Sequence, residues 1–208
     1  MFKQHLLNDK LLVRFGALLV VVMLSFLVSW TLSYLLIPEG MLRGRTVGHV
    51  WAGSGLAGGS VWLEWLRILA INLGVMLVVI VAPNLFRTES HYPFGYGTVI
   101  LLAVNAGTVL GTDSFAIPLG GKVPPTIAVF ESSGLYEITA YVLASAATYS
   151  ITRWRLVGKW PKQTVERPAL PATPSVLRER KVGLLVAIVI LAAACAWEAY
   201  RISLVVAP

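Results

Sequence analysis

The 208-residue sequence is poor in charge and in cysteine. Only 13% of its residues are Asp, Glu, Lys or Arg, about half the share found in ordinary soluble domains. Its single cysteine excludes an internal disulfide, and with it a disulfide-stapled scaffold. Apolar residues instead make up 57% of the chain and gather in long runs. The composition therefore excludes a typical soluble enzyme, a disordered tail and a collagen-like chain, and it predicts an integral membrane protein.

The sequence also lacks the motifs that carry familiar chemistry. His5, His49 and His91 fall in three different segments, and no His or Cys pair has the spacing of metal ligands, so we expect no metal site and no cofactor. There is no Walker A loop, no His-Glu-x-x-His helix and no Gly-x-Ser-x-Gly elbow. These absences exclude an ATPase and a standard intramembrane metalloprotease, and they predict a protein that is not an enzyme.

Long apolar runs define the expected architecture, because a membrane-spanning helix needs about 20 mostly apolar residues. Five segments qualify, and a short interfacial helix is expected over 1–12. The start of the fourth span is ambiguous, because Pro124 and Pro125 could open a helix well before Gly134. We predict an all-α fold, a polytopic helix bundle that forms one integral membrane domain over 1–208. The predicted transmembrane spans are 13–37, 66–82, 94–111, 126–152 and 182–206.

Basic residues orient the bundle, because Lys and Arg are retained in cytoplasmic segments. A cytoplasmic N-terminus puts twelve of the 17 Lys and Arg residues on the cytoplasmic side, so we predict a multi-pass protein of the cell membrane in that orientation. Much of the surplus lies in 153–181, whose prolines predict a stiff, irregular linker facing anionic lipid or a partner protein. No nucleic-acid-binding motif accompanies it, so no nucleic-acid partner is expected. The basic residues singled out there are Arg153, Arg155, Lys159, Arg178, Arg180 and Lys181.

Residues 114–125 follow the third span and are rich in Gly and Pro. Such a segment is either a plain outer loop, which we favour, or a re-entrant turn that lines a cavity. A cavity is the one setting in which irregular backbone survives at membrane depth.

Two stripes of small residues predict close helix packing. Small side chains repeated every four residues let two helix backbones approach closely in lipid. We interpret both stripes as packing surfaces. They are Ala103, Gly107 and Gly111 in the third span, and Ser25, Ser29 and Ser33 in the first.

A few polar side chains lie inside the spans, and Glu137 is the sharpest of them. An acid at the bilayer centre costs roughly 2.5–3.5 kcal/mol, so it must be shielded, protonated or partnered. A helix starting near Pro125 would place Glu137 near mid-membrane, whereas one starting near Gly134 would leave it at the outer boundary, and both remain open. The predicted intramembrane polar cluster is Asn72, Asn105, Thr108, Glu131, Glu137 and Tyr141.

Three short motifs carry a resemblance to a known family. They are Asn72 in the second span, Asn105-Ala106-Gly107 with Gly111 in the third, and Ser132-Ser133-Gly134-Leu135-Tyr136-Glu137 opening the fourth. With these motifs the stretch from Asn72 to about Thr152 resembles the stage II sporulation protein M family of multi-spanning membrane proteins. Ser-Ser stands where that family has Pro-His, so Glu137 is left to pair with Asn72 or Asn105 in place of a histidine.

The resemblance implies about five helices and a role that depends on partner proteins. Members of the family have no clear active-site signature. They act in a peptidoglycan-remodelling complex during engulfment, beside ABC transporters, or in machinery that matures and exports circular bacteriocins.

Three functions are therefore open at this point. The first is a non-enzymatic membrane subunit that assembles with other membrane subunits or with itself, in contact with membrane lipid. The alternative is a permease-like component of an ABC-type export or maturation system, in which Asn72, Asn105 and Glu137 line a polar path and a cytoplasmic ATPase binds the 153–181 linker. The least favoured is an intramembrane enzyme using Glu131 and Glu137, which lie about 120° apart around a straight helix.

Overall fold

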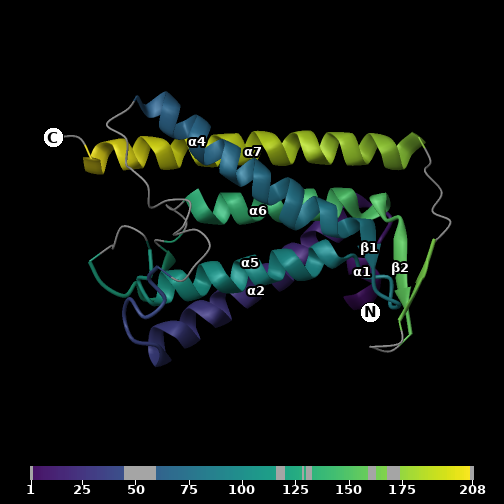
Figure 1. Ribbon diagram of the computed structural model, residues 1–208, viewed down its shortest axis with the longest axis horizontal. Coiled ribbons are helices and arrows are strands. Elements are labelled where there is room, and N and C mark those ends of the chain that lie inside the picture. The colour runs from purple at the N-terminus through teal and green to yellow at the C-terminus, as the bar shows by residue number, and fades with distance from the viewer. Residues whose placement is uncertain are drawn as a thin grey trace.

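The computed structural model describes residues 2–44, 60–115, 120–127, 129, 133–158, 163–167 and 174–206. In these residues the chain is a bundle of long helices with a small sheet at one end (Figure 1). The helices are α1 (Phe2–Leu6), α2 (Leu11–Leu36), α4 (Val61–Gly74), α5 (Phe94–Gly111), α6 (Ser133–Ala147) and α7 (Pro174–Val206). α4 continues as a π-helical segment, η1 (Val75–Val81), and a 3₁₀ turn, η2 (Ala82–Leu85), and α6 continues as a 3₁₀ turn, η4 (Thr148–Ile151). The strands are β1 (Phe86–Arg87), β2 (Trp154–Val157) and β3 (Thr164–Glu166).

Among the described residues, four helical segments are long and apolar enough to cross a membrane, as expected of an all-α polytopic membrane protein. α5 occupies the predicted range 94–111 and follows Pro93, which stands at its N-cap position. The other three begin before the predicted spans, because helices continue past the hydrocarbon core through polar residues such as Glu64 in α4 and Arg180 in α7. The four segments are Leu11–Leu36, Val61–Leu85, Phe94–Gly111 and Pro174–Leu204.

α6 is the central helix of the bundle and differs most from its predicted span. It begins at Ser133 rather than near 126, because Pro124 and Pro125 lead into a single turn, with the Val129 amide bonded to the Thr126 carbonyl at 3.4 Å. Its residues 140–147 are all buried, and it packs against α2, α5, α7 and η1. The other helices therefore enclose α6, which at 15 residues is shorter than each of the four spans.

The two stripes of small residues pack against each other inside the chain. Gly107 lies so close to α2 that an added Cβ would stand 2.5 Å from the Phe26 carbonyl oxygen. The same atom at Gly111 would stand 2.6 Å from the carbonyl oxygen of Trp30. The hydroxyl of Ser33 lies 3.4 Å from the Gly107 carbonyl oxygen, and Ala103 is fully buried. The stripes thus bring α2 and α5 together and leave no small-residue ridge of theirs for another protein.

The expectation of an irregular linker over 153–181 is wrong. β2 pairs in parallel with β1 and antiparallel with β3, so strands form despite the nearby prolines. The rings of Phe86 and Trp154 stack at 5.0 Å, and the Arg153 amide donates to the Leu85 carbonyl at 2.8 Å, which fixes β2 to the end of the α4 segment. Pro174 begins α7, where the missing amide hydrogen costs no helical bond.

The basic residues predicted for this linker are therefore divided between elements. Arg178, Arg180 and Lys181 lie on the first turns of α7. Arg155 lies in β2, where its guanidinium donates to the Glu89 carbonyl at 3.1 Å, and Arg153 precedes that strand. Lys159 lies outside the described residues.

The expected helix over 1–12 is also shorter than predicted. α1 ends at Leu6, because the Asn8 side chain accepts the amide hydrogen of Lys10 at 2.9 Å and forms a turn before α2. Arg14 reaches back to the carbonyls of Asn8 and Asp9 and holds that turn.

The bundle has two distinct ends (Figure 1). The sheet end holds the N-terminus, the three strands and the start of α7. The opposite end, called here the C-terminal end, holds the last turns of α7 and the first turns of α4 and α6.

Candidate functional site

Side chains from α4, α6 and α7 meet in a polar cluster inside the bundle. The hydroxyl of Tyr141 on α6 donates to Oδ1 of Asn72 on α4 at 2.6 Å. Nδ2 of the same amide donates to Sγ of Cys195 on α7 at 3.5 Å. Tyr141 and Cys195 are buried. The Asn72 amide therefore links three helices through its oxygen and its nitrogen, in a setting where lipid offers no hydrogen bond.

Two carboxyl groups meet at the side of this cluster that lies nearer the C-terminal end. Glu137 precedes Tyr141 by four residues on α6, and Glu198 follows Cys195 by three on α7. The two acids lie close enough to interact directly with each other. The structure therefore pairs Glu137 with Glu198 and not with Asn72 or Asn105.

The depth of Glu137 follows from where α6 begins. A start at Ser133 puts Glu137 about 6 Å along the helix, which is the boundary position of the two that the sequence allowed. The side chain is nevertheless shielded, and within the described residues its buried Oε1 atom has no hydrogen-bond partner. Glu137 is thus a sheltered acid close to the C-terminal end of the bundle.

Glu64 and Arg67 extend the cluster along α4 toward the same end. Nε of Arg67 lies 4.0 Å from Oε1 of Glu64, and Glu64 is near enough to Glu198 for the two acids to repel each other. We call the three-helix cluster together with its three acids the polar track. Its residues are Glu64, Glu198, Glu137, Cys195, Tyr141 and Asn72.

A second polar cluster lies toward the sheet end and is built around Asn84. Its Nδ2 donates to the Ser145 carbonyl at 2.9 Å and to Oγ1 of Thr148 at 2.7 Å. Its Oδ1 accepts the amide hydrogen of Gly95 at 2.9 Å. Asn84 is fully buried and joins η2 to α5 and to the end of α6, so its role is structural.

Two buried arginines close the sheet end of α6. Nε of Arg87 donates to Oγ1 of Thr152 at 2.6 Å, and Nη2 donates to the Tyr149 carbonyl. Nε of Arg14 donates to the Ala146 carbonyl at 3.0 Å. Both guanidinium groups lie over the Tyr149 ring, Arg87 at 3.9 Å and Arg14 at 4.8 Å from its centroid. They therefore cap the carbonyl end of a helix, where cations are favourable.

Burial lowers the pKa of Arg87 below its ordinary value, and the neighbouring Tyr149 opposes that change. An arginine nevertheless remains charged in a protein. The positive charge is therefore a permanent part of this end of the bundle.

The polar track and the Asn84 cluster both contact one face of α6, at different points along the helix. Tyr141, Ser145 and Thr148 follow Glu137 at intervals of four, four and three residues, which is the repeat of one helix face. The Ser145 hydroxyl is fully buried and has no hydrogen-bond partner among the described residues. A polar face thus runs along α6 between the two clusters.

The π-helical segment aligns the opposing helix with this face. Residues twelve apart, such as Asn72 and Asn84, differ by about 120° around an unbroken α-helix. In η1 the i→i+5 pattern turns the chain less per residue, so both amides bond to α6 or to the turn that follows it. Between them Met76 and Ile80 are buried and close the interface with apolar side chains.

The remaining residues predicted for the polar cluster lie elsewhere. Asn105 is exposed on the outer surface of α5 and is not part of the polar track. Thr108 donates its hydroxyl to the Val104 carbonyl of its own helix at 2.8 Å. Glu131 lies outside the described residues.

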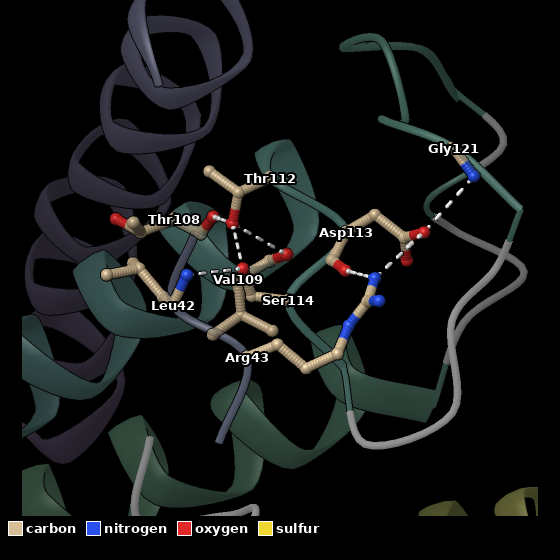
Figure 2. A network of polar contacts seen from close by, with 8 residues as sticks. All are labelled: Leu42, Arg43, Thr108, Val109, Thr112, Asp113, Ser114 and Gly121. Atoms are coloured by element: carbon tan, nitrogen blue, oxygen red, sulfur yellow. Dashed lines mark hydrogen bonds and ion pairs between the residues drawn. The ribbon is translucent and has the colours of Figure 1, made fainter. Parts of the chain in front are cut away.

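A separate network fixes the loops beyond α5 (Figure 2). The Asp113 side chain is fully buried at a φ of 47°, and Arg43 reaches it with Nη2 at 3.8 Å from Oδ2 and 2.8 Å from the carbonyl oxygen. Oδ2 also accepts the amide hydrogen of Gly121 at 3.1 Å. Ser114 accepts from the Leu42 amide at 3.2 Å. The network ties the loop after α2 to the segment after α5, and part of that segment, 116–119, lies outside the described residues.

Glu198 is one of the members of the polar track that were not predicted from the sequence. It lies within the predicted span 182–206, and an acid inside an apolar span is by itself a signal for a functional or partnered residue. Glu64 was missed because the second span was expected to begin at 66. In the described part of the chain, no three His, Cys, Asp or Glu residues are grouped so that they could hold a metal ion.

Comparison with known proteins gives one match. The family described as Stage II sporulation protein M matches residues 62–201, which is 140 of the 208 residues. The matched range contains every residue of the polar track and extends past the stretch 72–152 on both sides. Neither a curated protein nor a solved structure matches the chain.

Proposed function

The chain belongs to the stage II sporulation protein M family, and from this premise we propose that it is a non-enzymatic subunit of a membrane complex. In this proposal it is a multi-pass protein of the cell membrane that acts by assembling with other membrane subunits or with a second copy of itself. In the same proposal the protein has no catalytic residues of its own, and membrane lipid surrounds it.

The observation that carries this proposal is the position of Asn105. The residue lies eleven positions after the first residue of α5, or about 16 Å along an apolar helix of 18 residues, and it is exposed. For comparison, the hydroxyl of Thr31, which is exposed on α2, donates to the Leu27 carbonyl of its own helix at 2.8 Å. The Asn105 side chain makes no hydrogen bond or ion pair with any of the residues that the structure describes. An amide in hydrocarbon is stabilised by a hydrogen bond across a helix interface, which a partner helix provides.

The charged and aromatic residues at the two ends support the proposed orientation. The sheet end carries Arg178 and Lys181 on α7, which suit a cytoplasmic leaflet of anionic lipid. Trp62, Trp197 and Tyr200 are exposed near the C-terminal end, as aromatic side chains are at a membrane interface. The N-terminus is then cytoplasmic and the polar track lies nearer the opposite face.

The test is the mass of the protein released from native membranes under mild solubilisation. We expect particles heavier than the monomer, and Asn105→Leu is expected to shift them toward monomer. Leu32→Ala on the exposed surface of α2 serves as the control and leaves the mass unchanged. A strictly monomeric, partner-free wild-type particle would refute the proposal.

A second function is favoured by the polar face of α6. In this alternative the protein is a permease-like component of an export system, the polar track lines part of the path, and a cytoplasmic ATPase binds at the sheet end. The supporting observation is the polar face that runs from Glu137 past Tyr141 and Ser145 toward the sheet end. Met76 and Ile80 close the path in this state.

The alternative is tested by comparing the peptides and proteins secreted by wild-type cells, a deletion strain and point variants. We expect Glu137→Gln to remove the same secreted species as the deletion while the protein still assembles at normal mass. Glu39→Gln changes an exposed acid outside the polar track and is the matched control. Normal secretion by Glu137→Gln would exclude the polar path.

A further inference from the structure

The outer surface of α5 carries a stripe that no described residue covers. Gly97, Leu101 and Asn105 are exposed and follow one another at intervals of four, so they form one face of the helix, called here the α5 face. Leu101 is 68% exposed, and a Cβ added at Gly97 would meet no atom within 4 Å. Another helix can therefore approach the α5 backbone closely at this face.

An apolar groove borders the α5 face on one side. It lies between α5 and the end of the α4 segment, and Val78, Ala82, Phe86 and Phe94 line it together with Gly97 and Leu101. Lipid chains would fill such a groove as well as a protein side chain does, so the groove alone does not identify an occupant. The identification comes from the amide one turn beyond it.

The Asn105 amide has donors and an acceptor, so it is complementary to a second copy of itself. In a dimer with a two-fold axis along the membrane normal, a residue near the axis faces its own copy at the same depth. Two Asn105 side chains placed in this way can form hydrogen bonds with each other. A different protein would need a polar side chain at that depth to do the same.

We infer that two copies of this chain associate through the α5 face, with the two Asn105 amides hydrogen-bonded to each other across the two-fold axis. The inference rests on the proposed function, because it names the partner of that assembly as a second copy. It uses a surface that is distinct from the polar track, and it leaves the surfaces of α2 and α7 to lipid or to other subunits.

Cysteine cross-linking in native membranes tests the inference. Leu101→Cys places a thiol on the α5 face and keeps Asn105, and the wild-type chain is the blank because its only cysteine, Cys195, is buried. Mild oxidation is expected to give a band at twice the monomer mass. Val189→Cys is the control, because this residue is 60% exposed on α7, which lies beyond α6 from α5 (Figure 1).

Variants at Asn105 test the hydrogen bond within that dimer. Adding Asn105→Leu to Leu101→Cys is expected to weaken the dimer roughly ten-fold, and Asn105→Gln is expected to preserve most of it. Asn105 is exposed, so an unchanged unfolding midpoint in detergent confirms that these variants are folded.

The outcomes separate this inference from the proposed function. A cross-linked band that contains a different protein would overturn the second-copy inference and leave the membrane-subunit function standing. A dimer that is insensitive to Asn105→Leu, or equal cross-linking at Val189→Cys, would also overturn the inference. No cross-link together with a monomeric native mass would overturn both.

Discussion

Replacing Gly107 with alanine tests the contact between α2 and α5 directly. The new Cβ would stand 2.5 Å from the carbonyl oxygen of Phe26 and 3.0 Å from the amide nitrogen of Trp30, and Ser29 Oγ would be closer still. Real Cβ atoms do not approach other atoms below 3.0 Å, so the helices must separate by at least about 0.5 Å to relieve the carbonyl contact. Because backbone atoms oppose the new methyl group, rotation of a side chain cannot remove the strain.

The expected loss of stability follows from two opposing effects. Overpacking of a tight contact costs typically 1–3 kcal/mol, and backbone opposition places Gly107→Ala near the upper value. Alanine is favoured over glycine in a helix interior by about 1 kcal/mol. The net loss is therefore about 2 kcal/mol, which corresponds to a fall of roughly 4–8 °C in the unfolding midpoint of a chain of this size.

The assay is thermal unfolding of purified variants in one detergent, followed by tryptophan fluorescence. Gly16→Ala on α2 is the matched control, because a Cβ there meets no atom within 4 Å and only the helix preference changes. Ser29→Ala combined with Gly107→Ala removes the contact with the Ser29 hydroxyl and should recover part of the lost stability. The recovery is incomplete because the Phe26 carbonyl still opposes the methyl group. Equal midpoints for Gly107→Ala and Gly16→Ala would refute the close approach of the two helices.

Three further substitutions test other contacts. Tyr141→Phe removes the donor to Asn72 and should lower the free energy of unfolding by about 0.6–1.7 kcal/mol in a denaturant titration in micelles. No change in that free energy would mean that the Asn72 amide has another donor. Arg87→Lys should lower the free energy of unfolding by about 2–3 kcal/mol in the same titration, because an ammonium group cannot both stack on Tyr149 and reproduce the guanidinium hydrogen bonds. A variant as stable as the wild type would contradict the capping role of Arg87. Asp113→Ala should cost about 1–3 kcal/mol and speed proteolysis of the neighbouring loops, and unchanged cleavage rates would argue against the clamp in Figure 2.

The parts of the fold that the sequence predicted have local signals. α5 lies over 94–111 because Pro93 stands at its N-terminus and a polar segment beginning at Thr112 ends it. Asn72, Glu137 and Tyr141 were singled out because polar groups in apolar spans need partners, and the structure brings these three side chains into one cluster.

The parts that the sequence did not predict depend on residues far apart in the chain. Glu198 lies 61 residues from Glu137, and nothing in the order of residues indicates that their helices are neighbours. β2 is stabilised by Phe86 and Leu85 from a different segment, so a stretch with prolines on both sides still forms a strand. The sequence also does not indicate that Arg14 is buried, with donors that bond to carbonyls at the end of α6 and in the turn before α2.

The position of α6 sets the order in which the bundle can be completed during synthesis. α6 leaves the ribosome before α7, yet its carboxyl partner Glu198 and the glycine that receives Ala147, Gly183, both belong to α7. Until α7 is inserted, Glu137 lacks its partner carboxyl and the alanines of α6 that face α7 are not covered by protein. The last helix made is thus the one that closes the core, and a nascent chain that stalls before Glu198 leaves Glu137 without its partner acid in an apolar setting, where an ionisable group is costly.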